Sequence, residues 1–253
     1  MWVPPGTLLD VSEATKGNGL TGGRLRNDRL VVAIDGPSGS GKSSTARAVA
    51  DKLGLSYLDT GAMYRAATWL AVHQGVDLTD TETVARLVAH AEFDIDLDPR
   101  CPTIAIEGHD VTTEIRRPEV SAAVSAVATN LSVRADLVSR QQRLIKEAPS
   151  GVVAEGRDIT TVVAPDADVR VLLVADPEAR VARRHAELGE GIDAADVTDQ
   201  VIRRDRDDAT VAKFESAAPG VVVVDSTFLD LDQVVETICA LAPSDGRPES
   251  AAS

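Results

Sequence analysis

The chain lacks the features that mark secreted and membrane proteins. It has two cysteines in 253 residues, too few for a disulfide framework or a cysteine metal cluster, which fits a reducing cytosol. No apolar run approaches the roughly 20 residues that a membrane-spanning helix needs. The first residues also carry no hydrophobic segment of a secretory signal. We therefore expect a cytoplasmic protein with no membrane partner.

Aromatic residues and positive charge are also scarce. Aromatics make up 3% of the chain, so the core must consist mainly of Val, Leu, Ile and Ala. Lys and Arg number 26 against 40 Asp and Glu, a formal net charge of −14. Such a balance argues against nonspecific binding to nucleic acid or to anionic lipid. An anionic ligand must then be captured by a local basic site.

The pattern of apolar residues predicts one large α/β domain at 30–242, between flexible tails at 1–29 and 243–253. Runs typical of strands buried on both faces occur at 30–34, 55–59, 151–154, 169–174 and 221–225. Helical patterns occur at 43–53, 64–73, 132–147, 177–187, 196–207 and 232–241. This alternation predicts a parallel sheet covered on both faces. Short runs at 93–97, 103–107 and 111–112 instead predict a small antiparallel insert.

A glycine-rich motif lies between the first strand and the first helix. Gly36-Pro37-Ser38-Gly39-Ser40-Gly41-Lys42-Ser43 fits the pattern G-x-x-x-x-G-K-[ST]. Its glycines allow a tight loop whose amides point inward at the positive end of the following helix. In such loops the lysine, here Lys42, reaches the β- and γ-phosphates, and the hydroxyl of Ser43 would bind Mg²⁺. The motif predicts a nucleoside triphosphate ligand and leaves the acceptor open.

Three classes of protein use such a loop: switch GTPases, hydrolytic or motor ATPases, and small kinases. A GTPase needs a guanine-reading [NT]-K-x-D, which the sequence lacks, and we find no apolar strand ending in Asp-Glu, as an ATPase usually has. A small kinase needs arginines that converge on two phosphate-bearing ligands. Of the 26 basic residues only five are lysine, and the arginines are clustered, which favours the kinase.

The clusters lie at strand ends and on later helices. Asp59-Thr60-Gly61-Ala62-Met63-Tyr64-Arg65 closes the second strand and opens a helix that Thr60 could cap. Glu155-Gly156-Arg157-Asp158 follows the strand at 151–154, at the end where open parallel sheets bind ligands. Arg180, Arg183 and Arg184 share one helix face, and 203–208 alternates in charge. Each pattern alone is also typical of a solvated surface. Beside a phosphate loop, they suggest a lid over the transferring phosphoryl group.

These motifs, in this order, resemble those of the bacterial cytidylate kinases, which phosphorylate CMP and dCMP with ATP. The resemblance spans about 31–241 and includes Gly108-His109-Asp110-Val111, Glu114-Ile115-Arg116, Ile159 and Val224-Asp225-Ser226-Thr227. It implies a P-loop NTPase fold in three layers with a parallel sheet, an enlarged antiparallel NMP-binding insert at about 61–147, and an arginine-rich helical lid at about 183–203. It also implies a monomer.

The resemblance implies roles for individual residues as well. ATP would be held by Gly36, Pro37, Ser38, Gly39, Ser40, Gly41, Lys42, Ser43 and Ser44, with Mg²⁺ on Ser43 and on Asp35 through a water. The catalytic groups would be Lys42, Arg180, Arg183 and Arg184. CMP would be bound by Ser125, Arg134 and Asp158 at the base, by Arg204 and Asp208 with Thr60 at the ribose, and by Arg65 and Arg157 at the phosphate.

The sequence departs from the family pattern at a few positions. Val211 stands where a further phosphate-binding arginine is usual, with Lys213 two positions on. Thr160 replaces a common glycine, and Ala164 a usual phenylalanine. Two other functions stay open: a P-loop kinase with another small acceptor, and a diverged nucleotide-binding paralogue with weak or no turnover. Selectivity for cytosine nucleotides would distinguish a cytidylate kinase from a kinase with another acceptor. Turnover would distinguish it from a paralogue that only binds nucleotides.

Overall fold

The computed structural model describes residues 29–188, 203, 205–207, 209–212, 214 and 216–243. Both predicted tails, apart from their innermost residues, lie outside this part of the chain, as does most of the helix expected at 196–207. No helix in the described ranges is long and apolar enough to cross a bilayer.

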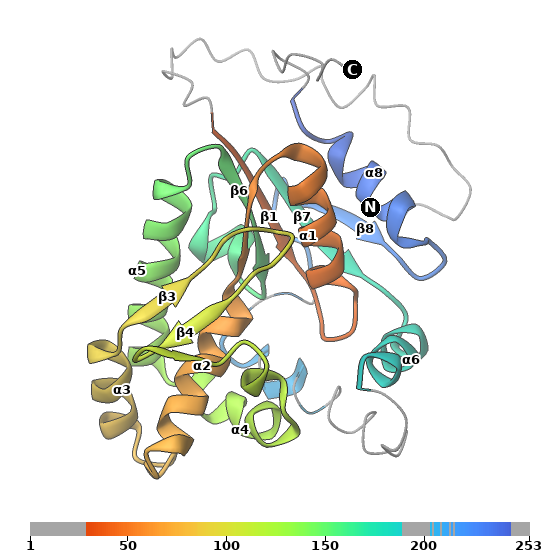
Figure 1. Cartoon of the computed structure of the whole chain (residues 1–253). Coiled ribbons are helices and arrows are strands. Elements are labelled where there is room, and N and C mark those ends of the chain that lie inside the picture. The colour runs from red at the N-terminus through yellow and green to blue at the C-terminus, as the bar shows by residue number, and fades with distance from the viewer. Residues whose placement is uncertain are drawn as a thin grey trace.

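A five-stranded parallel sheet forms the centre of the molecule, in the order β2-β6-β1-β7-β8 (Figure 1). The strands are β1 (Leu30–Asp35), β2 (Ser56–Asp59), β6 (Gly151–Gly156), β7 (Val169–Val174) and β8 (Val222–Asp225). All five lie where the sequence predicts them, and the parallel pairing is confirmed. The central strand β1 therefore ends beside β6 on one side and β7 on the other. This brings the loops after β1 and β6 together at one edge of the sheet.

Helices cover both faces of this sheet. Alternate residues of a strand point to opposite faces, so Val32 and Ile34 pack with α1 (Lys42–Leu53) and α8 (Leu231–Cys239). Ala33, between them, belongs to the other face, which packs against α2 (Thr60–His73) and α5 (Leu131–Glu147). The core consists almost wholly of Val, Leu, Ile and Ala, as the scarcity of aromatics requires. The predicted three-layer architecture is confirmed.

The predicted small antiparallel sheet is present. Its strands are β3 (Phe93–Ile95), β4 (Ile104–Ile106) and β5 (His109–Asp110). The third strand was expected at 111–112 and lies two residues earlier, because Glu107 (φ 51°) and Gly108 (φ 73°) make a tight turn. Ile106 therefore already pairs with His109. The sequence analysis missed the helices α3 (Thr81–His90) and α4 (Pro118–Ala128) and the short η1 (Glu114–Arg116).

Two further elements shape the edge where the strands end. The helix α6 (Pro177–Leu188) follows β7, and η2 (Ile159–Val163), a single π-helical turn, follows β6. In Figure 1, α6 lies on the same side of the sheet edge as the loop between β1 and α1. Loops and helix ends from several parts of the chain thus surround the carboxyl ends of β1 and β6.

Candidate active site

Close packing requires two glycines of the loop between β1 and α1. A Cβ on Gly36 would lie 2.1 Å from the carbonyl oxygen of Leu173 on β7. Gly39 has a φ of +73°, and a Cβ there would lie 2.5 Å from the carbonyl oxygen of Arg180. Larger residues would push the loop away from the sheet and α6. The loop therefore keeps its amides, together with the first turn of α1, at the wall of the main cavity.

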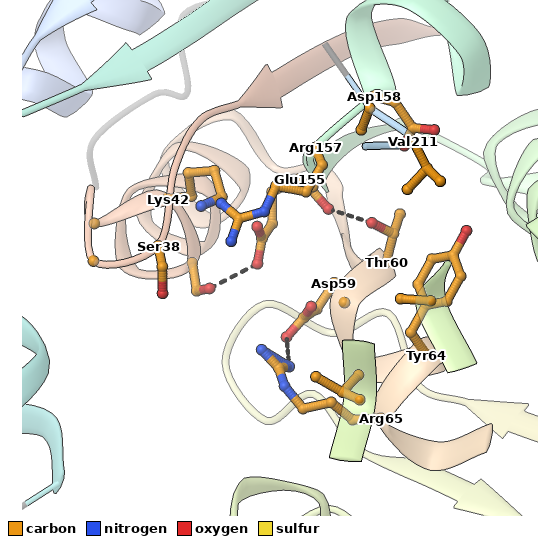
Figure 2. Close-up of a pocket in the computed structure, with 18 of the residues that line it drawn as sticks. Ser38, Lys42, Asp59, Thr60, Tyr64, Arg65, Glu155, Arg157, Asp158 and Val211 are labelled. Carbon is orange, nitrogen blue, oxygen red and sulfur yellow. Dashed lines mark hydrogen bonds and ion pairs between the residues drawn. The ribbon is translucent and has the colours of Figure 1, made fainter. Parts of the chain in front are cut away.

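Lys42 and Ser43 are the first two residues of α1, and both line that wall. The ammonium group of Lys42 donates to the carbonyl of Pro37 at 2.8 Å. The hydroxyl of Ser43 donates to Oε1 of Glu155 at 2.6 Å, and this contact is drawn in Figure 2. Burial raises the pKa of the Glu155 carboxyl, Asp59 raises it further, and Lys42 opposes both. The structure thus places a buried carboxylate directly beside the phosphate loop.

The sequence analysis missed Glu155 as a site residue. The expected signal was an apolar strand that ends in Asp-Glu, whereas β6 is an apolar strand that ends in one acid followed by glycine. The register of the sheet pairs Glu155 with Ile34, so its side chain lies next to the loop that follows β1. A hydroxyl and a carboxylate are oxygen ligands of the kind Mg²⁺ prefers. Ser43 and Glu155 therefore fit that ion.

Asp35, which the resemblance implies would act on a bound metal through a water, contacts the turn after β6. Its side chain is buried and is not among the residues that line the cavity. Its carboxylate accepts hydrogen bonds from the backbone N–H of Ile159 and of Thr160, both at 2.8 Å, and from the Thr160 hydroxyl at 2.6 Å. Burial raises the pKa of Asp35, while these bonds lower it. Asp35 therefore holds the turn after β6, and Thr160, unusual at this position, supplies one of the donors.

The wall opposite the phosphate loop is formed by α2, α4, α5 and the end of β6. Figure 2 shows Tyr64, Arg65, Asp158 and Val211 across from Ser38 and Lys42. Besides the residues of the phosphate loop and Glu155, the cavity is lined by Asp59, Thr60, Gly61, Tyr64, Arg65, Val124, Ala128, Arg134, Gly156, Arg157, Asp158, Arg184, Val211 and Ala212.

The start of α2 presents Arg65 to this cavity. Asp59 caps the helix by accepting from the backbone N–H of Ala62 at 2.8 Å, so the cap expected at Thr60 is wrong. Thr60 is instead the first residue of α2, and its hydroxyl donates to the carbonyl of Glu155 at 2.8 Å. Arg65 pairs with Asp59 at 3.8 Å, and its Nη1 is buried without a hydrogen-bond acceptor among the residues described. An anion in the cavity could supply that acceptor.

Arg134 and Asp158 meet at the far end of the cavity. Nη2 of Arg134, on α5, donates to Oδ2 of Asp158, which follows β6. Burial raises the pKa of Asp158, and the adjacent guanidinium lowers it. The Arg134 guanidinium also lies 5.9 Å from the centre of the Tyr64 ring. Ser125, the third residue implied at the base, is half-exposed on α4 and is not among the residues that line the cavity.

The remaining arginines surround the phosphate loop. Arg157 donates to the carbonyl of Gly36 and lies 4.7 Å from the Phe214 ring centre, and Arg180 donates to the carbonyl of Ser38 at 3.0 Å. Arg184 lines the main cavity, as does Val211. Arg183, next to Arg184, instead lies outside the main cavity. Arg204 and Asp208, implied at the ribose, and Lys213 lie outside the described residues.

Arg183 belongs to a second cavity on the outer side of the phosphate loop. Its guanidinium donates to the hydroxyl of Ser226 at 2.9 Å and to the carbonyl of Ser226 at 2.6 Å, which ties α6 to the loop after β8. This cavity is lined by Ser40, Gly41, Ser44, Thr45, Arg183, Ala186, Ser226, Leu229, Asp230, Leu231 and Val234. The phosphate loop thus has a cavity on either side, one rich in arginine and one largely neutral.

Comparisons with known proteins identify the family of the chain. A family model described as Cytidylate kinase matches residues 32–244. A cytidylate kinase of Cutibacterium acnes is 56% identical over 215 residues, which cover 85% of this chain and 96% of that one. Cytidylate kinases of Streptomyces avermitilis and Rhodococcus jostii are each 47% identical, over 217 and 215 residues, and cover 84% and 83% of this chain and 92% and 93% of their own. This chain belongs to the cytidylate kinase family.

Proposed function

We propose that the protein transfers the γ-phosphoryl group of ATP to CMP and dCMP, which makes it a phosphotransferase with a phosphate group as acceptor. The observation that carries this proposal is a single cavity with a phosphate loop on one wall and the Arg134–Asp158 pair on the other. The names of the relatives support the choice of acceptor. We also propose, from the resemblance, that the enzyme is a cytoplasmic monomer.

The donor nucleotide would bind across the phosphate loop. Its phosphates would accept from the loop amides and from Lys42, at the positive end of α1. Its base and ribose would occupy the second cavity, beside Leu229, Leu231 and Val234, where apolar side chains offer contact area to a purine ring. Arg183, fixed by Ser226, would form the wall of that cavity nearest the phosphates.

Magnesium fits the oxygen ligands at Ser43 and Glu155. The ion, when bound, would neutralise negative charge on the donor phosphates, to which Mg²⁺ is usually attached together with one or two protein ligands. The contribution of the chain is to keep the Glu155 carboxylate next to the Ser43 hydroxyl in a buried position.

The acceptor nucleotide would bind on the opposite wall. Asp158 would accept a hydrogen bond from the amino group of cytosine, and Arg134 would donate to its ring nitrogen or carbonyl. Arg65 and Arg157 would hold the phosphate, to which Arg65 can offer Nη1, an atom without a hydrogen-bond acceptor among the described residues. From the resemblance alone, Ser125 would contact the base, and Arg204 and Asp208, with Thr60 nearby, would contact the ribose.

Transfer then needs no general base. The acceptor phosphate is ionised at neutral pH, so one of its oxygens can attack the γ-phosphorus while the bond to the β-phosphate oxygen breaks and ADP leaves. The residues contribute alignment of the two nucleotides and compensation of the charge that spreads over the transferring group. Lys42, Arg180 and Arg184 are the cations proposed for that task, with Arg183 beside the donor.

A coupled ADP-release assay with CMP, dCMP, UMP and AMP tests the proposal. We expect strong turnover with CMP and dCMP and little with UMP or AMP. The Lys42→Ala protein, purified in the same way, gives the background rate from contaminating kinases. Turnover with a different acceptor would identify another small-molecule kinase. CMP binding without turnover, measured by calorimetry, would identify a nucleotide-binding paralogue that has lost catalysis.

A further inference from the structure

Asp205 connects the phosphate loop to Arg157 and Arg180. It belongs to a helical segment, described at 205–207, that follows α6 in the chain. Its Oδ1 accepts a hydrogen bond from the backbone N–H of Ser38 at 2.8 Å and lies 3.2 Å from Nη2 of Arg157. Its Oδ2 accepts from Nη1 of Arg180. One carboxylate is thus held by the phosphate loop and by two arginines.

These three donors are of the kind that binds a phosphoryl group. A loop amide and two guanidinium groups offer only N–H donors, arranged around one anion. Arg180 has one donor to spare, because its Nε is buried without an acceptor among the described residues. A phosphoryl group carries three non-bridging oxygens at its end and a carboxylate has two. The site therefore has more donors than Asp205 satisfies.

The carboxylate and a phosphoryl group cannot share these donors. Both are anions, and at hydrogen-bond distance in a partly buried site their repulsion would be large. The side chains of Arg157 and Arg180 are 14% and 13% exposed, so water screens them little. One anion must leave when the other enters.

We infer that the Asp205 carboxylate occupies the position of the terminal phosphoryl group of ATP in the nucleotide-free enzyme and is exchanged for it when ATP binds. This inference rests on the proposed function for the identity of the nucleotide. Asp205 is a positioning residue. It keeps Arg157 and Arg180 together at the lip of the phosphate loop, where two unpaired guanidinium groups would repel each other. The exchange weakens ATP binding, since the ion pairs must break first.

The neighbouring Asp207 provides a matched control. It lies two residues further along the same helical segment, and its carboxylate pairs with Arg206 at 3.7 Å. Within the described ranges, no hydrogen bond or ion pair connects it to the phosphate loop. Asp207→Asn therefore removes the same charge from the same segment without opening the phosphoryl position.

Calorimetric titration of Asp205→Asn and Asp207→Asn with ATP, ADP and inorganic tripolyphosphate tests the inference. For Asp205→Asn we expect Kd for ATP and for tripolyphosphate to fall about three- to tenfold, which corresponds to the typical net contribution of one hydrogen bond. The Kd for ADP, which lacks the terminal group, should change by less than about twofold. Asp207→Asn should leave all of these constants unchanged. Unchanged or weaker ATP binding, or an equal change for ATP and ADP, would overturn the inference.

Two measurements keep the result interpretable. Thermal unfolding shows whether the Asp205→Asn variant is folded. If that variant is not folded, Asp205→Ala, which carries neither the carboxylate nor an amide, is titrated in its place. Tripolyphosphate binding does not depend on the acceptor or on turnover. If CMP is not the acceptor, the proposed function fails while the exchange is still measured. If wild-type protein binds neither ATP nor tripolyphosphate, both fail.

Discussion

The donor wall of the cavity takes its residues from one stretch of the chain, between Ser38 and Ser44, whereas the acceptor wall takes its residues from α2, α4, α5 and the turn after β6. The donor wall offers mainly backbone amides and one lysine. The acceptor wall offers charged side chains held in pairs, such as Arg65 with Asp59 and Arg134 with Asp158. A single substitution should therefore have a different effect on each wall. Donor changes should affect turnover, and acceptor changes should affect the choice of base.

Lys42→Ala gives the largest expected effect and tests whether the two walls are independent. Turnover should fall by about a thousandfold, the upper range for loss of one preorganised group that stabilises the transferring charge. The Kd for CMP should stay within about twofold of wild type. The measurements are kcat by ADP release and CMP binding by calorimetry. Lys52→Ala, on the last turn of the same helix and exposed, is the control. An equal loss of CMP affinity would show that the walls are coupled.

Glu155→Gln examines the contact between the walls, because Glu155 belongs to β6 and bonds to Ser43. We expect turnover to fall about a hundredfold, since a neutral amide is a poor partner for Mg²⁺. Wild-type activity should rise as pH increases through the raised pKa of Glu155, above the usual carboxyl value of 4.5, and this rise should be weaker in the variant.

The same substitution should act in the opposite direction on stability. The pKa of Glu155 is raised in the folded state, so the folded protein binds a proton more tightly than the unfolded chain does. The contribution of this group to the free energy of unfolding therefore falls as pH rises from the usual carboxyl range through the raised value. In Glu155→Gln the free energy of unfolding does not undergo this decrease, because glutamine does not titrate. At neutral pH the variant should therefore unfold at the same temperature as wild type or at a higher one. The exposed Glu236→Gln is the control, and a clear drop in unfolding temperature would contradict the prediction.

Asp158→Asn sharpens the comparison on the acceptor side. A carboxylate accepts only, whereas an amide also donates and can therefore pair with the carbonyl that uracil has in place of the cytosine amino group. The ratio of kcat/KM for CMP over UMP should fall by at least about tenfold, while the Kd for ATP stays unchanged. Asp136→Asn, which disturbs a different arginine pair on α5, is the control. Full retention of the preference for CMP would remove Asp158 from base recognition.

Val211→Arg should give the smallest effect. Val211 is half-buried in the wall of a cavity that already contains Arg65, Arg134, Arg157 and Arg184. A further cation should lower KM for CMP about two- to fivefold and leave kcat nearly unchanged, because the phosphate already has donors. Val211→Met, which adds size without charge, separates the effect of side-chain size from the effect of the added charge. A large rise in kcat would mean that the native valine limits catalysis.

The fold and the donor wall could be predicted because their causes are local. The apolar runs of β1, β6 and β7 reflect burial on both faces, and the phosphate loop is contiguous, with glycines where close contacts exclude a side chain. The helices α3 and α4 were missed, although α3 begins after a capping Asp80 and α4 has Pro118 in its first turn. Short helices in an irregular insert give a weak pattern, so local signals such as these are easily overlooked.

The sequence by itself therefore determined the parallel α/β core, the phosphate loop and the family. It also supplied the residue types from which the acceptor site is proposed. Only the tertiary structure decided which of them meet. Ser43 reaches Glu155 across 112 positions of chain, Arg134 reaches Asp158 across 24, and Ser38 reaches Asp205 across 167. Periodicity and glycine content report on neighbouring residues, whereas contacts between side chains from distant segments depend on how the strands are ordered and how the helices pack on them.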